Sequence, residues 1–205
     1  MVRVIRSRHQ GAEPIECTVL TNGTLVENAD LEFLAEHDVN LRVSFDGVAP
    51  AQARRASGTY RTVVNVLARA IRRQPGWARN RLSVAMIAQG ATVPTFARSI
   101  AKSMTMGLAE VRVGPLMNHD LEWGESTRRQ FEEQIEQVVI ASWRCWKRTG
   151  QVPVDFLRPD PPASLRRGAS VGGALCGACS RDSVAVDPDG RGWGCPSFMT
   201  SIQSL

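Results

Sequence analysis

Three of the chain's five cysteines, Cys176, Cys179 and Cys195, lie in a short stretch near its end. Between them lie an apolar run, residues 184–186, and the turn-forming sequence Asp-Pro-Asp-Gly at 187–190. We expect a β-hairpin here, because Asp-Gly after Pro supplies the positive φ that a tight turn needs. Such a hairpin would return Cys195 beside the first two cysteines. Thiolates gathered in this way are ligands for a soft metal or an iron–sulfur cluster.

Three thiolates do not complete a structural zinc site, which needs four ligands. The three histidines, His9, His37 and His119, are distant from these cysteines in the sequence. A fourth ligand would come either from elsewhere in the fold or from a continuation that this chain lacks. The remaining cysteines, Cys17 in an expected strand and Cys145 beside the apolar stripe of an expected helix, are interpreted as packed thiols.

The spacing Cys176-x13-Gly190-x4-Cys195 resembles the opening of the SPASM domain, the auxiliary-cluster module of radical S-adenosyl-L-methionine (AdoMet) peptide and protein maturases. In that family further downstream cysteines complete two [4Fe–4S] clusters. The resemblance implies that Cys176 and Cys195 hold the first auxiliary [4Fe–4S] cluster. Cys179 stands where the family commonly has glycine, and it is either an additional metal ligand or a spectator.

Two polar segments that follow expected strands resemble the third and fourth strand ends of the radical AdoMet partial barrel: Thr-Asn-Gly-Thr at 21–24 and Ser-Phe-Asp-Gly at 44–47. The resemblance implies that Asn22, Ser44 and Asp46 face AdoMet. In the family an arginine after the fourth strand pairs with the AdoMet carboxylate, to which a guanidinium can donate two parallel hydrogen bonds. Arg54 and Arg55 are the candidates, and we assign Arg55. Taken singly, Asn-Gly and Asp-Gly are ordinary turn pairs.

Strand and helix patterns alternate along the first 150 residues, which predicts an α/β fold with a parallel sheet. We expect strands at 15–20, 39–45, 82–87 and 110–114, with helices between them. Asn28 is the expected N-cap of the first helix, and Thr127 with Gln130 forms an expected capping box for the last one, which Gly150 ends. The buried residues expected on that last helix are Phe131, Ile135, Val138, Val139 and Trp146, and the packing tryptophans are Trp143, Trp146 and Trp193.

Taken together with the resemblance, this pattern predicts a partial radical AdoMet (β/α) barrel of about four parallel β/α units, followed by the start of a SPASM β-hairpin module. The expected domains are a partial barrel at 1–150, a linker at 151–173 and the SPASM start at 174–205. Asp155 and Asp160 lie in the proline-rich linker, where solvated carboxylates are a simpler interpretation than acid–base groups.

Composition and charge limit the classes of partner that we expect this chain to bind. The net charge is +5, but the arginines are scattered among acidic residues, so we expect no nucleic-acid partner. Residues 1–14 are basic without an apolar core, and no apolar run is long enough to span a membrane, so we expect neither a secretory signal nor a membrane partner. An odd number of cysteines without an export signal favours a cytoplasmic location with reduced thiols.

The function implied by the resemblance is reductive cleavage of AdoMet followed by hydrogen abstraction from a peptide or protein substrate, with ferredoxin or flavodoxin as reductant. The family's defining Cys-x3-Cys-x2-Cys motif is absent from this sequence. We therefore expect a fragment or degenerate homologue that is inactive alone. One alternative is a non-catalytic module that binds zinc, an iron–sulfur cluster or a peptide. Another is a partial barrel that does not fold stably.

Overall fold

The computed structural model of the chain describes residues 15–116, 120–158 and 184–194. The chain divides into two compact units, Met1–Arg158 and Pro159–Leu205. In the described residues, no helix combines the length and apolar character needed to cross a membrane.

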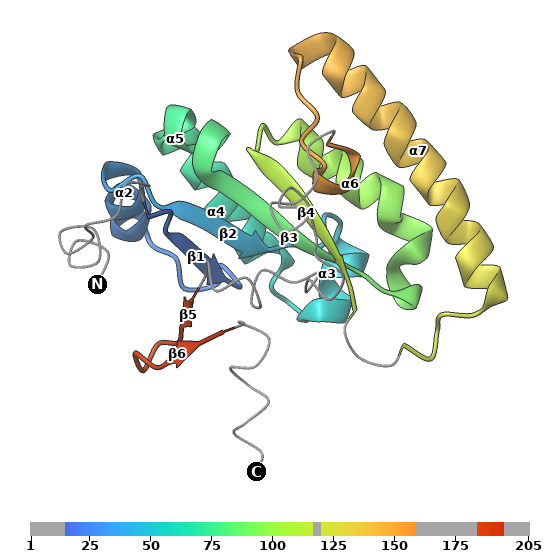
Figure 1. Ribbon diagram of the computed structural model, residues 1–205, viewed down its shortest axis with the longest axis horizontal. Coiled ribbons are helices and arrows are strands. Elements are labelled where there is room, and N and C mark those ends of the chain that lie inside the picture. The colour runs from blue at the N-terminus through green and yellow to red at the C-terminus, as the bar shows by residue number, and fades with distance from the viewer. Residues whose placement is uncertain (1–14, 117–119, 159–183, 195–205) are drawn as a thin grey trace, which may run out of the picture. The chain divides into compact units, whose positions relative to one another are not determined.

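The first unit is built on a sheet of four parallel strands in the order β1-β2-β3-β4, which is also their order in the chain (Figure 1). Parallel neighbours need crossover connections, and helices provide them here. The expected α/β fold of about four parallel β/α units is therefore confirmed. The strands are β1 Thr18–Thr21, β2 Asn40–Ser44, β3 Leu82–Ala88 and β4 Glu110–Pro115.

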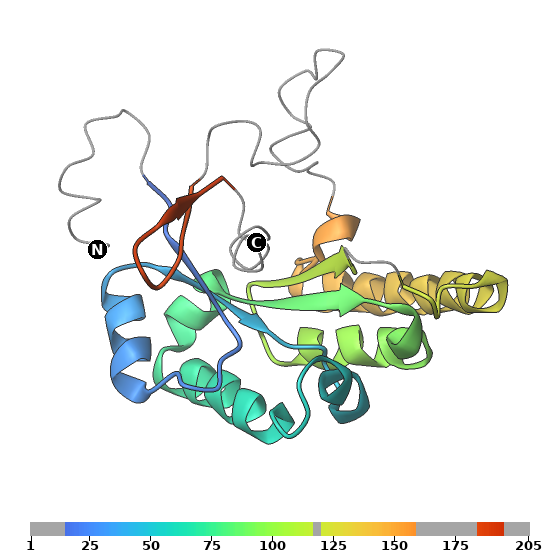
Figure 2. The same cartoon turned by 90° about the horizontal axis from the view of Figure 1, so that it is seen from below.

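The helices lie along one face of the sheet, as Figure 2 shows from below. Among the described residues, no α-helix covers the other face of the strands. The α-helices are α2 Asn28–Glu36, α3 Ala49–Arg55, α4 Tyr60–Arg73, α5 Pro75–Arg81, α6 Phe96–Thr105 and α7 Glu125–Thr149. The described part of this unit also holds the 3-10 helices η1 Gly90–Thr95 and η2 Asp155–Leu157.

The core forms between the sheet and the helices because alternate strand residues point to opposite faces. On β2 and just after it, Leu41, Val43 and Phe45 are fully buried on the helix side, whereas Arg42 and Ser44 point to the open side. The helices contribute one apolar stripe each, and the stacked rings of Phe45 and Tyr60 join β2 to α4. The helical residues buried in this core include Leu31, Leu34, Val63, Leu67, Ala70, Ala78, Phe96, Ile100 and Val138.

The expected helix caps at two helix starts are wrong. Helix α2 is capped by Glu27 and not by Asn28: the Glu27 N–H donates to Asp30 Oδ2 at 2.9 Å, in a capping box. Helix α7 begins two residues before Thr127, whose hydroxyl donates to the Glu122 carbonyl at 2.9 Å. The expected end is confirmed, because Gly150 adopts φ 70° at the C-cap of α7.

The buried stripe expected on α7 is confirmed in part. Val138 is fully buried, and Cys145 is a packed thiol as expected. Val139 and Trp146 are 46% and 44% exposed, so the expected burial of these two residues is wrong. Trp143, expected to be a packing residue, is 54% exposed and stacks on Trp146. Helix α7 contacts the rest of the unit along a narrow stripe, which is why its flanks stay in solvent. Cys17 lies just before β1, half-buried against the core.

Residues 151–158 pack against β4 within the first unit. Val154 is fully buried and forms a parallel bridge with Val111. Arg158 fixes the segment, because its guanidinium donates to the Val152 carbonyl at 3.0 Å and to Glu110 at 2.9 Å. Asp155 is not a freely solvated carboxylate, since its Oδ1 accepts the Val113 N–H at 3.1 Å. Asp160 lies outside the described residues.

The described part of the second unit is the predicted β-hairpin, with antiparallel strands β5 Ala185–Val186 and β6 Gly192–Trp193. Gly190 adopts φ 85°, the positive value that the turn sequence predicts. Asp187 closes the turn: its carboxylate accepts the Arg191 N–H at 2.8 Å and the Trp193 indole N–H at 2.9 Å. These hydrogen bonds, the indole bond first, lower the pKa of Asp187.

Candidate functional site

The polar strand ends singled out in the sequence meet at the carboxyl edge of the sheet. Thr21 is in register with Val43, and Ser44 is in register with Ala85. Asn22 directly follows Thr21, and Ser44 directly follows Val43. The two residues therefore lie side by side at the carboxyl ends of adjacent strands. Loops beyond the carboxyl ends of parallel strands are where α/β proteins bind ligands.

Asn22 holds its loop with one end of its side chain and leaves the other end free. Its Oδ1 accepts the N–H and the hydroxyl of Thr24 at 3.0 and 2.9 Å, while its amide nitrogen has no hydrogen-bond partner among the described residues. The next residue must be glycine: Gly23 has φ 79°, and a Cβ there would lie 2.8 Å from the Val43 side chain. The loop thus packs on β2 and presents an exposed carboxamide donor.

Ser44 is half-buried on the open face of the sheet, and its hydroxyl has no partner within the described part of the chain. The neighbouring Val43 and Phe45 are fully buried on the opposite face. A partly desolvated hydroxyl without a partner favours binding of a polar ligand, because its hydrogen-bonding capacity is otherwise unmet.

Asp46 and Arg55 bind each other. Arg55 donates from Nε and Nη2 to the two carboxylate oxygens of Asp46, at 2.8 and 2.9 Å. Asp46 is 1% exposed, and its Oδ1 also accepts the Ile87 N–H at 3.0 Å. Arg55 reaches the Ala85 carbonyl at 3.3 Å as well. The bidentate pair therefore ties the end of β2 to β3 and to the last turn of α3.

Gln52 completes this brace from the middle of α3. The side chain is 2% exposed; its Oε1 accepts the Asp46 N–H at 2.9 Å and its Nε2 donates to the Thr59 hydroxyl at 3.1 Å. Arg54, the other arginine considered in the sequence, is exposed and has no ion-pair partner among the described residues. Of the two arginines, only Arg55 lies at the strand ends.

The amino half of the open face carries a charge cluster around Glu110. Its carboxylate, on a side chain 18% exposed, lies 3.6 Å from Arg42, 3.0 Å from Arg112 and 2.9 Å from Arg158. Burial, and then the charge of Arg112, lower the pKa of Arg42. Arg42 and Glu110 lie in one cross-strand row through Ser83, and Arg112 lies in the next row, which passes through Ala85 to Ser44, so the cluster adjoins Ser44 on the open face.

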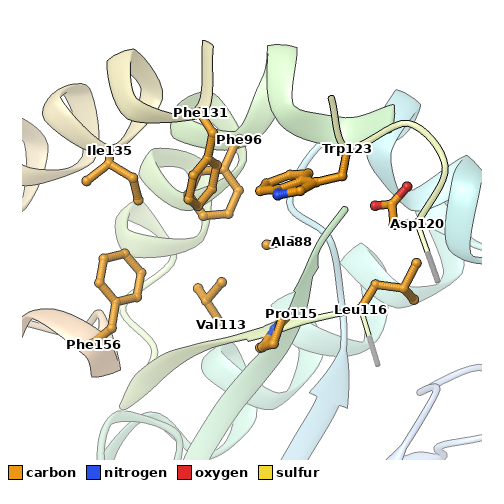
Figure 3. Close-up of a pocket in the computed structure, with 11 residues that line it drawn as sticks. Ala88, Phe96, Val113, Pro115, Leu116, Asp120, Trp123, Phe131, Ile135 and Phe156 are labelled. Atoms are coloured by element: carbon orange, nitrogen blue, oxygen red, sulfur yellow. The ribbon is translucent and has the colours of Figure 1, made fainter. Parts of the chain in front are cut away.

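A cavity of about 700 Å³, which sequence reasoning missed, lies near the carboxyl ends of β3 and β4 (Figure 3). It is on the helix side of the sheet, because Val113 shares that face with the buried Val111. Asp120 reaches it, but its two oxygens accept the N–H groups of Gly90 and Glu122 at 2.7 and 3.1 Å. The only sequence signal was the number of aromatic residues in this part of the chain. The lining residues are Ala88, Phe96, Val113, Gly114, Pro115, Leu116, Asp120, Trp123, Phe131, Ile135 and Phe156.

The predicted metal ligands Cys176, Cys179 and Cys195 lie outside the described residues. Within the residues that are described, no three His, Cys, Asp or Glu side chains gather as a metal site would require. Strand β6 ends at Trp193, two residues before Cys195 in the sequence.

Comparison with known proteins shows the fold. No protein-family model matches the sequence, and no curated protein matches it. Among solved structures the chain is similar to native anSMEcpe with bound AdoMet and Cp18Cys peptide, with a TM-score of 0.60 and 13% sequence identity. The match covers 97% of this chain and 56% of the other, so the chain spans little more than half the length of that protein. The sheet and its helical layer are thus an arrangement that, in the matched protein, accompanies bound AdoMet and peptide.

Proposed function

We propose that this chain provides the AdoMet-binding strand ends of a radical AdoMet maturase that acts on a peptide or protein. The carrying observation is a pair of polar groups that no protein atom among the described residues engages, the Asn22 amide nitrogen and the Ser44 hydroxyl, at adjacent carboxyl ends of a parallel sheet. The fold likeness to a protein with AdoMet and a peptide bound supports the same assignment. A cytoplasmic setting with reduced thiols and a ferredoxin- or flavodoxin-type reductant belongs to this proposal.

The residues divide into contacts and positioning groups. AdoMet carries a carboxylate, an ammonium group and ribose hydroxyls, which suit the amide donor of Asn22 and the hydroxyl of Ser44. Asp46 and Arg55 would act indirectly, because their charges already satisfy each other and hold Ser44 at its height in the sheet. When bound, AdoMet supplies one-electron chemistry that side chains lack, and the protein supplies its orientation.

Binding of AdoMet by the purified chain tests the strand-end assignment. Ser44→Ala and Asn22→Ala should each weaken binding about fivefold in isothermal titration calorimetry, since a net hydrogen bond contributes about 1 kcal/mol. Ser57→Ala, an exposed serine of the neighbouring loop, is the matched control and should bind like wild type. Equal affinity for all four proteins would overturn the assignment.

The proposal also includes an iron–sulfur cluster. We propose that Cys176 and Cys195, with Cys179 as a third ligand, hold a [4Fe–4S] cluster. Thiolate ligation gives such clusters visible charge-transfer absorption, so anaerobic reconstitution with iron and sulfide should colour the wild-type chain. Cys176→Ala and Cys195→Ala should lose the absorption, whereas the buried Cys145→Ser is the control and should keep it. Zinc bound without sulfide would contradict the cluster.

A second function, a non-catalytic peptide-binding module, is favoured by the cavity near β4. Its lining is apolar and aromatic, and its one carboxylate, that of Asp120, accepts hydrogen bonds from backbone N–H groups. The cavity would therefore bind a ligand by apolar contact and shape complementarity, without a free charged group. A peptide with an aromatic residue should change the fluorescence of Trp123, and Ile135→Asp should abolish the change. Binding that survives Ile135→Asp would exclude this cavity.

A further inference from the structure

Helix α7 exposes large apolar side chains outside its buried stripe. The helix packs on the rest of the unit through the buried Val138, Ser142 and Cys145, and in Figure 1 it runs beside α6 at the end of the helical layer. Nothing among the described residues covers its outward side. The exposed apolar residues are Val139 (46%), Ile140 (51%), Trp143 (54%) and Trp146 (44%). Tryptophans are enriched in protein interfaces, where burial of their rings is strongly favourable.

Six of the charged residues of α7 are arranged symmetrically about Ile140; the other three, Glu125, Arg128 and Arg129, form ion pairs with one another near the start of the helix. Three acidic residues precede it by eight, seven and four positions, and three basic residues follow it by four, seven and eight positions. The acidic residues are Glu132, Glu133 and Glu136, and the basic residues are Arg144, Lys147 and Arg148. All six are exposed, and none has an ion-pair partner within the described part of the chain.

Interactions inside the helix do not account for this arrangement. Residues four apart are neighbours on a helix, and both Glu132 with Glu136 and Arg144 with Arg148 carry like charges. Arg128 and Arg129 lie four residues before Glu132 and Glu133, but they form ion pairs with Glu125, at 3.0 and 3.2 Å. Favourable interaction with the helix dipole is confined to the first and last turns, so it accounts for Lys147 and Arg148 but not for the three acidic residues or Arg144. Glu136 and Arg144 have no residue of opposite charge three or four positions away on α7, so the helix alone leaves both unpaired.

We propose that α7 pairs antiparallel with α7 of a second copy of this chain, with the two-fold axis at Ile140. An antiparallel pair places Glu136 opposite Arg144 of the second copy and Glu133 opposite its Lys147, and the symmetry repeats both pairs. The two Ile140 side chains meet at the axis. A two-fold interface must be complementary to itself, which is what equal spacing of opposite charges about one residue provides.

The helix periodicity places these residues on one face. At 3.6 residues per turn, positions 133, 136, 140, 144 and 147 fall on the side opposite the buried stripe of α7. Trp143 flanks this face and stacks on Trp146 at 4.9 Å between ring centroids, whereas Trp146 and Val139 lie outside the face, nearer the buried stripe. Its ring also lies 5.2 Å from Lys147 Nζ, which brings that cation to the edge of the apolar patch.

The size of the contact sets its strength. One helix pair buries less than the roughly 1,600 Å² of a standard interface. We therefore expect a reversible equilibrium between monomer and dimer, visible as a rise in weight-average mass with concentration in sedimentation velocity experiments on the full chain.

Charge reversal tests the pairing. Glu136→Arg places arginine opposite Arg144 twice per dimer, and Arg144→Glu places glutamate opposite Glu136 twice, so each variant alone should weaken dimerisation at least tenfold. An equimolar mixture of the two variants should dimerise again, because both facing pairs become opposite in sign. Arg72→Glu on the exposed side of α4 makes the same charge change and should dimerise like wild type.

Circular dichroism spectra and melting curves of these surface variants verify that the fold is kept. Ile140→Asp should abolish the dimer by placing two like charges at the axis. A wild-type chain that stays monomeric at the highest soluble concentration would overturn the proposal. So would single charge reversals that still dimerise, or a mixture that does not restore the dimer.

Discussion

At the scale of single residues, Asp46 and Arg55 illustrate what a sequence can and cannot predict. The Asp-Gly pair marked the end of a strand and drew attention to Asp46. The partner of that carboxylate depends on α3, a helix that the sequence analysis did not predict. The resemblance assigned Arg55 to the strand-end site, but as a partner of the AdoMet carboxylate and not of Asp46. The location of the site was therefore predictable, and the internal ion pair was not.

Removal of this ion pair should be costly. Asp46→Ala leaves the Arg55 guanidinium and the Ile87 N–H without their acceptor in a buried setting, which should lower the free energy of unfolding by about 3 kcal/mol. Glu32→Ala removes the exposed Glu32–Arg73 pair at 2.9 Å and should cost less than about 1 kcal/mol. Urea unfolding of both variants gives the comparison. Similar losses for the two would contradict the role assigned to Asp46.

Asp155 should make stability depend on pH. Burial raises its pKa above 3.8, although the N–H groups of Val113 and Phe156 partly oppose the shift. A raised pKa in the folded state means that folding favours the protonated form. The stability contributed by Asp155 is therefore full below pH 3.8 and falls as the pH rises through the folded-state pKa.

Asp155→Asn keeps an oxygen acceptor for Val113 without the ionisation, so it should remove this pH dependence. Asp155→Ala also removes the acceptor and should be about 1–2 kcal/mol less stable than the asparagine variant. Unfolding free energies measured across the acidic range test both statements. A difference between wild type and Asp155→Asn that does not change with pH would show that burial does not govern this carboxyl.

At the scale of elements, the strands were predicted better than the short helices. Burial on alternate residues, as at Leu41 and Val43, is a strong local signal for β2. Helices α3 and α5 are seven residues long, which is too short for a helical period to stand out from the sequence. The buried side of α7 was predictable in part, because the sequence gives a helix's apolar stripe but not how much of it neighbours cover.

The turn after β2 depends on a close approach to α6. Gly47 has φ 83°, and a Cβ there would lie 2.5 Å from the backbone of Ser99. Gly58 has a similar φ of 77°, but a Cβ at that position would have no other atom within 4 Å, so Gly58 is a matched control. Gly58→Ala should cost about 1 kcal/mol for its backbone conformation alone. Gly47→Ala adds a clash and should cost about 3 kcal/mol in total.

Thermal and urea unfolding of these two alanine variants separate conformation from contact. If the two variants were equally stable, the close approach of the turn to α6 would not contribute to the free energy of unfolding.

At the scale of the whole molecule, the sequence predicted the class of fold because strand and helix patterns alternate through the first 150 residues. It did not predict that residues 151–158 belong to the first unit. Their role depends on long-range contacts, such as the bridge between Val154 and Val111 and the ion pair between Arg158 and Glu110. A proline-rich stretch gives no local signal for such contacts.

The outer edge of β1 has a consequence for handling the protein. Among the described residues, β1 pairs only with β2, and Val19 and Leu20 are 38% and 55% exposed. An apolar strand edge with unused N–H and C=O groups templates the addition of strands from other chains. Leu20→Lys should therefore raise the fraction of expressed protein recovered in the supernatant. Leu25→Lys alters a loop residue that is 87% exposed and should not change it. The yield of the expressed chain would then be limited by aggregation through the free edge of β1, and the single lysine at position 20 would prevent that aggregation.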